Sequence, residues 1–243
     1  MAFESTVREG VLRVEAAGAR WLSSDPDGGF RDADAAYNVS VPTGWDRTDL
    51  DAYAAERRDR AGFGTPGPTL FTGVEMQHLC GARAGSVVAY ATAGISNPAA
   101  LPMAPDGRDD RTGESEETVE SDDEDDRPAG TVNLLVGTTR ALDDGTLASL
   151  YGVVVEAKAA TLLAETGFPG TTTDAAVVGT LPAGEPAAFA GSGTDVGDAA
   201  RACVREALRG SLRSRYAEQS LPASVDDAEH GTATTRRATT FDP

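Results

Sequence analysis

The chain has 243 residues, with 39 acidic residues against 21 basic ones and a formal net charge of −18. A surface this acidic repels polyanions, which argues against binding to nucleic acid or to an anionic membrane. The length suits one domain with a sizeable core. Apolar segments run through the chain, so the acidity indicates a folded protein adapted to molar salt, where the Debye length is about 3 Å.

The basic residues are almost all arginine, and Lys158 is the one lysine in the sequence. Cys80 and Cys203 lie far apart and frame no disulfide scaffold. The first residues contain neither a basic region nor an apolar stretch, so we expect no signal peptide. Without a run of about 18 apolar residues we expect no membrane span either. These features predict a cytoplasmic protein, and no pattern predicts its oligomeric state.

Sequence patterns in the first half of the chain predict several strands and one helix. Alternating apolar residues and short β-rich runs indicate the strands, and the helix has Thr48 or Asp49 as its expected N-cap. We expect strands at 10–22, 36–41 and 86–93, and the helix at 49–60.

The second half of the chain predicts two strands and two longer helices. We expect strands at 131–136 and 174–181 and helices at 144–166 and 196–216, the first helix ending at Gly167. The fold class is therefore mixed α/β, a single domain with helices packed on a β-sheet.

Two segments are expected to lie outside this ordered domain. Residues 106–127 carry twelve acidic residues and three arginines, a net charge of −9, so like-charge repulsion predicts a disordered loop inserted in the domain. Residues 217–243 are rich in Ser, Thr and Asp and are expected to be a mobile tail. The predicted division is therefore a domain at 1–216 and a disordered tail at 217–243.

Common cofactor and metal signatures are missing from the sequence. His78 and Cys80 form one H-x-C pair, but no second ligand pair accompanies it, and zinc needs three or four protein ligands. The chain contains neither a P-loop nor a dinucleotide-binding glycine motif. We therefore expect no metal and no cofactor.

Polar residues in apolar or glycine-rich surroundings are the candidates for chemistry, because strand ends that enter loops often carry sites. They are Asn38, Glu75, Ser96, Asn97, Asn133, Glu156, Lys158, Thr171, Thr172, Thr173 and Asp174.

Each candidate also has a structural interpretation. A buried asparagine often ties loop backbone together. Glu156 and Lys158 are two residues apart and face different sides of a helix, so we expect no pair between them. Lys158 lies on the apolar stripe and would either extend to solvent or meet a carboxylate from elsewhere. The residues 171–174 form either a turn or a cradle for an oxyanion.

Several segments together resemble the adenosylcobinamide amidohydrolases of archaeal corrinoid salvage. They occur in the family's order and cover nearly all of the ordered chain: RWLSSDPDGGFRDADAAYNVSV (20–41), FTGVEM (71–76), ATAGISNPA (91–99), GTVNLLV (130–136), VEAKAATLLAETG (155–167), GTTTDAAVV (170–178) and FAGSGTDVGDAARACVREAL (189–208). Two features differ from the family pattern. The acidic loop stands where relatives have a short connection, and the Gly-Thr element before Asp174 is shorter.

The resemblance implies hydrolysis of the amide that joins the corrin propionyl arm to aminopropanol in adenosylcobinamide, giving adenosylcobyric acid. The corrinoid is then the small-molecule partner, and its cobalt belongs to the substrate. For this reaction we predict the catalytic candidates Glu75, Glu156, Lys158 and Asp174. The predicted substrate-binding residues are Asn38, Ser96, Asn97, Asn133, Thr172 and Thr173.

Two mechanisms remain open from the residues alone. In the first, which we favour, Glu75 or Glu156 activates water while Asn97, Asn133 or backbone amides near Thr172 hold the oxyanion. In the second, a hydroxyl such as that of Ser96 or Thr173 is the nucleophile and Lys158 is its base or proton shuttle.

Two other functions compete with this enzyme. One is a corrinoid-binding carrier without hydrolytic activity. The other is an unrelated amidase or acyltransferase with a threonine nucleophile, which would cleave its own chain before a threonine.

Overall fold

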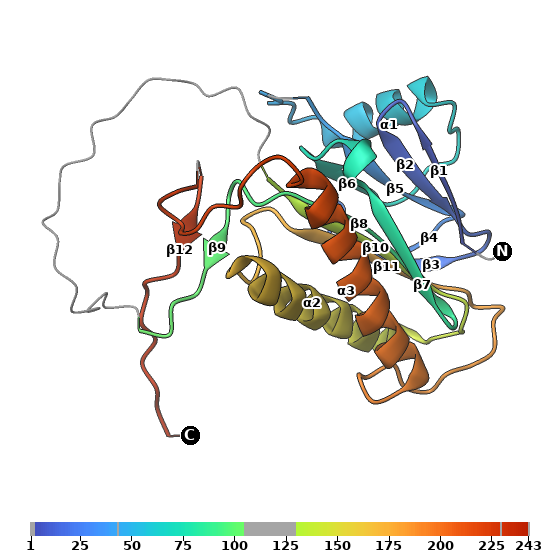
Figure 1. Cartoon of the computed structure of the whole chain (residues 1–243). Helices are drawn as coiled ribbons and strands as arrows, with labels where there is room; N and C mark the ends of the chain where they lie inside the picture. Colours follow the sequence, from blue (N-terminus) through green and yellow to red (C-terminus); the bar gives the residue numbers. More distant parts are fainter. Residues whose placement is uncertain (1–2, 43, 105–129, 229, 243) are drawn as a thin grey trace, which may run out of the picture.

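The computed structural model describes residues 3–42, 44–104, 130–228 and 230–242. Two β-sheets lie face to face, with α1 on the outer side of one and α2 and α3 on the outer side of the other (Figure 1). The predicted mixed α/β single domain with helices packed on a sheet is confirmed, and the second sheet is an addition to it.

The first sheet has the order β1-β2-β5-β6. Strand β2 pairs antiparallel with both β1 and β5, and β6 pairs parallel with β5. The strands are β1 (Glu4–Arg8), β2 (Val11–Glu15), β5 (Ala35–Ser40) and β6 (Thr69–Thr72).

The second sheet has the order β4-β3-β11-β10-β8-β7. At its centre β10 runs parallel to β11 and antiparallel to β8. The strands are β3 (Arg20–Ser23), β4 (Gly29–Asp32), β7 (Cys80–Ala84), β8 (Val87–Ala93), β10 (Val132–Thr138) and β11 (Ala175–Thr180). The central strands β8 and β10 are buried along their whole length.

Helix ends follow the expected capping chemistry. In α2 (Asp144–Thr166) the Asp143 carboxylate accepts a hydrogen bond from Thr146 N, and Gly167 ends the helix with a left-handed φ of 82°. In α3 (Asp195–Arg215) Thr194 accepts from Gly197 N. In α1 (Leu50–Arg60) Asp49 is the N-cap residue but makes no capping hydrogen bond, because its carboxylate pairs with Arg47.

Three apolar clusters fill the space between these layers. The largest lies between the second sheet and helices α2 and α3, the next between the two sheets, and a third under α1. Helix α2 is long and apolar enough to cross a membrane, but a helix buried in the core of a globular protein has the same length and composition. Its Leu147, Leu150 and Val154 are fully buried against the sheet.

The predicted single strand at 10–22 is wrong. The structure has β2 and β3 instead, which belong to different sheets. Between them Gly18 takes a left-handed φ of 67°, and its N–H donates to Asp34 Oδ1 at 2.7 Å. An alternating apolar pattern continued across this turn, so it did not show where the chain changes sheets.

The other predicted elements are confirmed within one or two residues of their bounds. Among the strands of these two sheets, β1, β4, β6 and β7 were not predicted. Strands β1, β4 and β7 are short and largely exposed or half-buried, so they lack the apolar alternation that marks a strand. Strand β6 is mostly buried but has only four residues, too few for a clear pattern. The predicted disordered loop at 106–127 lies outside the described residues.

The C-terminal segment packs on the domain. Leu221 and Val225 lie against the largest apolar cluster, and β12 (Thr232–Ala233) pairs parallel with β9 (Ala99–Ala100). Mobility of residues 217–243 stays a prediction, but the described part of this segment has defined contacts.

Two paired glycines make room for aromatic rings between the sheets. Gly137 and Gly179 are partners in the β10–β11 ladder. A Cβ atom on Gly179 would lie 2.5 Å from the ring of Trp21, and one on Gly137 would lie 2.5 Å from that of Phe3. Phe3 and Trp21 pack edge to face with centroids 5.8 Å apart.

We predict that Gly179→Ala lowers the free energy of unfolding by about 1–3 kcal/mol, because the added methyl displaces the Trp21 ring. The control is Gly152→Ala on the exposed face of α2, where a Cβ atom meets nothing within 4 Å. It should stabilise the protein by up to about 1 kcal/mol. Denaturant unfolding in molar KCl measures both values, and equal stability of the two variants would contradict the packing described.

Candidate active site

Most of the predicted site residues meet at one end of the second sheet. Strand β8 ends there, and β10 and β11 begin there. The loop 95–98 follows β8, the loop 170–174 enters β11, and the middle of α2 covers both. These elements bring together Ser96, Asn97, Lys158, Thr172, Thr173 and Asp174.

Lys158 and Asp174 form an ion pair with side chains only 13% and 11% exposed. The Asp174 carboxylate also accepts from Val132 N at 3.2 Å and from the N–H and hydroxyl of Thr171. Four protein donors therefore occupy its two oxygens. The pair ties α2 to the starts of β10 and β11, and it confirms that Lys158 meets a carboxylate from elsewhere in the chain.

Gly170 is required beside this pair. A Cβ atom at Gly170 would lie 2.5 Å from Asp174 Oδ2 and 3.1 Å from Lys158 Nζ. Only a residue without a side chain lets the backbone pass so close to the pair.

Asn97 organises two exposed hydroxyls. Its side chain is buried, and its Nδ2 donates to Thr172 Oγ1 at 2.7 Å and to Thr173 Oγ1 at 3.2 Å. Its backbone carbonyl accepts from Thr172 N at 3.1 Å. Both threonine residues are exposed, so a buried amide holds the hydroxyl groups of two exposed residues in fixed positions.

The Thr173 hydroxyl has further polar neighbours. Thr131 Oγ1 lies 3.0 Å away, and Thr173 Oγ1 donates to the carbonyl of Gly130 at 3.2 Å. The Ser96 hydroxyl accepts from Gly130 N. The hydroxyl of an exposed residue therefore lies beside a second hydroxyl, a backbone carbonyl and an amide donor, a polar setting that acyl transfer by a hydroxyl nucleophile can use.

Asn38 and Asn133 lie deeper, between the two sheets, and are 1% and 0% exposed. Asn133 Nδ2 donates to Asn38 Oδ1 and to the carbonyl of Phe71, both at 2.8 Å, while Asn38 Nδ2 donates to Thr92 Oγ1 at 2.9 Å. These bonds join the sheets behind the site. Their predicted role in substrate binding stays a prediction, and neither side chain reaches the surface in this structure.

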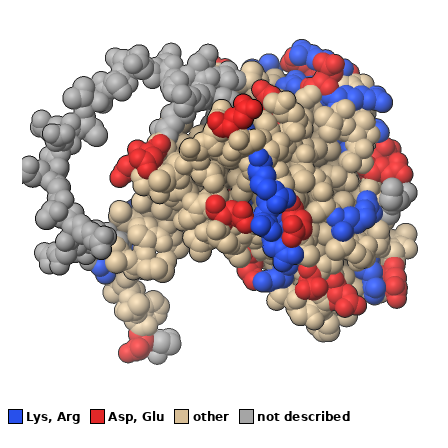
Figure 2. Space-filling model, in the orientation of Figure 1, with Lys and Arg blue, Asp and Glu red and all other residues tan. Residues whose placement is uncertain are grey.

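Glu75 and Glu156 lie apart from this cluster. Glu75 is exposed and accepts a hydrogen bond from Gln77 at 2.7 Å. Glu156 is exposed on α2 and pairs with Arg201 of α3, which confirms that it does not pair with Lys158. Arg201 continues as a column with Arg205 and Arg209, and Figure 2 shows this basic stripe interleaved with acidic side chains.

His78 has a structural partner. Its Nδ1 lies 3.0 Å from Ser214 Oγ, and burial lowers the pKa of His78 below its ordinary value. Within the described ranges no three His, Cys, Asp or Glu side chains are close enough together to hold a metal ion.

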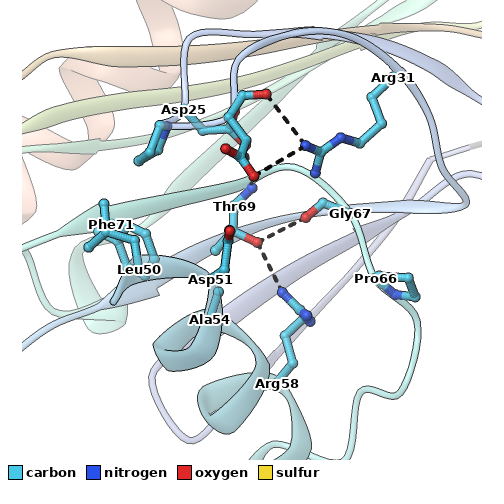
Figure 3. Close-up of a pocket in the computed structure, with 12 residues that line it drawn as sticks. Asp25, Arg31, Leu50, Asp51, Ala54, Arg58, Pro66, Gly67, Thr69 and Phe71 are labelled. Carbon is cyan, nitrogen blue, oxygen red and sulfur yellow. Dashed lines mark hydrogen bonds and ion pairs between the residues drawn. The ribbon is translucent and has the colours of Figure 1, made fainter. Parts of the chain in front are cut away.

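A polar cavity of about 230 Å³ opens beside β6, between α1 and the loop that joins β3 to β4 (Figure 3). Arg58 of α1 donates to Thr69 Oγ1 at 3.3 Å, and Thr69 N donates to Asp25 Oδ2 at 2.9 Å. Asp25 Oδ1 is buried and has no hydrogen-bond partner among the described residues. The cavity therefore combines guanidinium donors with an unsatisfied carboxylate acceptor.

Two hydrogen-bonded contacts connect this cavity with the cluster around Asp174. Ser24, next to Asp25, exchanges hydrogen bonds with Ala176, two residues after Asp174. Phe71 lines the cavity and accepts from Asn133. The three chain steps involved, each about 3.8 Å, and one hydrogen-bonded crossing of about 5 Å limit the Cα–Cα separation of Asp25 and Asp174 to roughly 16 Å.

Sequence reasoning missed several residues that shape this region. They are Asp25, Arg58, Gly130, Thr131 and Gly170. The SSDPDGG turn was a usable signal for Asp25, since two glycines after a strand mark a loop at which ligands bind. Thr131 and Gly130 carried no such signal, because their positions follow from the pairing of β10 with its neighbours.

Comparison with known proteins gives a consistent identification. The model of a family described as adenosylcobinamide amidohydrolase matches residues 2–220. A curated relative from Halobacterium salinarum, described by the same words, is 50% identical over 243 residues, which span 99% of this chain and 100% of the relative.

We predict that Lys158→Met lowers the free energy of unfolding by about 3–5 kcal/mol, because it leaves the Asp174 carboxylate buried without its cation. The matched control is Glu156→Gln, which breaks the exposed pair with Arg201 on the same helix and should cost at most about 1 kcal/mol. Denaturant unfolding compares them. A cost for Lys158→Met no larger than that of the control would show that the pair does not hold the strand starts together.

Proposed function

Because the chain belongs to the adenosylcobinamide amidohydrolase family and is thus a hydrolase acting on an amide, we propose that it releases aminopropanol from adenosylcobinamide. The other product would be adenosylcobyric acid, an intermediate that returns scavenged corrinoid to cobalamin biosynthesis in the cytoplasm. The observation that carries this proposal is the pair of threonine hydroxyls, from two exposed residues, that the buried Asn97 amide holds.

In this proposal Thr173 Oγ1 attacks the carbonyl carbon of the amide, and its proton passes to the leaving nitrogen through the hydroxyl of Thr131, which lies 3.0 Å from Thr173 Oγ1. The C–N bond breaks, aminopropanol leaves, and the corrinoid acid is held as an ester. Water then hydrolyses the ester and restores the hydroxyl. The hydroxyl of Thr172, whose oxygen accepts from Asn97, donates to the carbonyl oxygen as negative charge develops there.

The structure favours this hydroxyl mechanism over activation of water by Glu75 or Glu156. Both glutamates lie outside the cluster, and Glu156 is engaged with Arg201. Asp174 is the carboxylate that the described residues place in the cluster, and its oxygens are already occupied by four donors. In this proposal Lys158 and Asp174 hold the loop 171–174 in place.

We also assign the cavity beside β6 to substrate binding. The corrinoid carries neutral carboxamide arms, and a carboxamide offers both an N–H donor and a carbonyl acceptor. The unsatisfied Asp25 oxygen suits the donor, and the Arg58 guanidinium suits the acceptor. Contacts with a remote arm would orient the scissile amide at Thr173.

Incubation of the protein with adenosylcobinamide in molar KCl tests the reaction. Hydrolysis creates a carboxylate, so we expect the corrinoid to be retained longer on an anion exchanger, with little change in its visible spectrum. Tight binding with unchanged retention would instead identify a corrinoid carrier. If the protein neither binds adenosylcobinamide nor changes its retention, the proposed substrate is contradicted.

We predict that Thr173→Ala reduces kcat by at least about 10³-fold, as loss of a nucleophile does, without loss of folding. The controls are Glu75→Gln and Glu156→Gln, which should each keep kcat within about twofold. Steady-state kinetics measures all three. Full activity of Thr173→Ala with loss of activity in either glutamate variant would restore water activation by a carboxylate.

We predict that Asp25→Asn raises KM about 10-fold with kcat unchanged, because an amide NH₂ group would replace the unsatisfied acceptor in the wall of the cavity. The Asn oxygen can still accept from Thr69 N, so the fold should persist. Asp51→Asn removes the same charge from an exposed position on the rim of the cavity and serves as the control. Equal KM values for the two variants would remove the cavity from the substrate site.

A further inference from the structure

The loop that carries Asn97 lies between the loop 170–174 and the segment that follows α3. On one side, Ala99 N donates to the carbonyl of Gly170 at 2.9 Å, and Thr172 N donates to that of Asn97. On its other side, the loop forms hydrogen bonds with residues that follow α3. The position of Asn97 therefore depends on the loop 170–174 and on the C-terminal segment.

Four backbone groups of this loop are satisfied by the C-terminal part of the chain. Ile95 N donates to the Tyr216 hydroxyl at 2.7 Å. The carbonyls of Ser96, Pro98 and Ala100 accept from His230 N at 3.3 Å, Thr232 N at 2.9 Å and Thr234 N at 3.0 Å. Burial raises the pKa of Tyr216, so its hydroxyl stays protonated near neutral pH.

The C-terminal segment is also fixed by packing. Figure 1 shows it leaving the end of α3 and returning so that β12 lies beside β9. Leu221 and Val225 anchor it on the largest apolar cluster. A Cβ atom at Gly231 would lie 2.5 Å from the carbonyl oxygen of Val225, so the chain is tightly folded just before β12.

We propose that residues 230–234 are a positioning element of the active site. By pairing with residues 96–100 they press this loop against Gly170 and Thr171, and so hold Asn97 Nδ2 on the hydroxyls of Thr172 and Thr173. The inference rests on the proposed function. It extends the functional unit beyond residue 220, where the match to the family model ends.

Proline substitution tests the pairing in the full-length chain, because proline lacks the N–H group. The double variant Thr232→Pro/Thr234→Pro removes two of the three backbone donors that residues 230–234 offer to the 96–100 loop, and leaves His230 N in place. Ala233→Pro is the matched control. Backbone N–H groups alternate in direction along a strand, and those of Thr232 and Thr234 face the 96–100 loop, so the Ala233 N–H faces away from it. Each variant is assayed with adenosylcobinamide in molar KCl, and its thermal unfolding is followed in the same buffer.

We expect the double variant to lose about 10-fold or more in kcat, because a small displacement of a catalytic group has a large effect on rate. Its KM should change little, and its main unfolding transition should match that of Ala233→Pro. Hydrogen exchange at the Thr172 and Ala99 amides should accelerate in the double variant but not in the control.

Three results would overturn this inference. The first is equal kcat values for the two variants. The second is a rise in KM alone, which would make the segment a wall of the substrate site. The third is a loss of kcat that is explained by unfolding of the whole domain. An inactive wild-type protein would instead contradict the proposed function, so the two failures are distinguishable.

Discussion

The largely shielded ion pair between Lys158 and Asp174 is the interaction on which the site depends. It joins α2 to the starts of two central strands, β10 and β11. Separate charges at this depth would be costly, and together with the Thr171 donors they form a satisfied group. Their contacts fix the turn at 171–174, and this turn presents the Thr172 and Thr173 hydroxyls.

A second constraint is the layered architecture, which places polar groups at different depths. The hydrogen bond between Asn38 and Asn133 joins the two sheets in the interior. Asn97 lies nearer the surface of the same region and holds the hydroxyl of the exposed Thr172. Similar residue types thus have different roles because of their depth. The cavity at Asp25 adds a binding surface at the edge of the first sheet, linked to the cluster through Ser24 and Ala176.

The sequence predicted the central helices and strands well, because their apolar periodicity and end signals are strong. It left two structural roles open for Lys158, extension to solvent or a pair with a distant carboxylate, and the structure shows the second. It did not predict the turn at Gly18, because the apolar alternation continues through it. Nor could it show that Glu75 and Glu156 lie apart from the threonines of the 171–174 loop. That separation depends on which loops the sheet brings together, and such tertiary proximity leaves no trace in local spacing.

The central claim is that the loop 171–174 supplies the nucleophile for amide hydrolysis. Acid quenching during turnover at saturating adenosylcobinamide, followed by mass spectrometry of the digested protein, tests it most directly. The account predicts a corrinoid acyl adduct on the peptide that contains Thr173, and no such adduct in Thr173→Ala. Turnover with the Thr173 peptide unmodified at every quench time, or an adduct on a peptide from elsewhere in the chain, would contradict it.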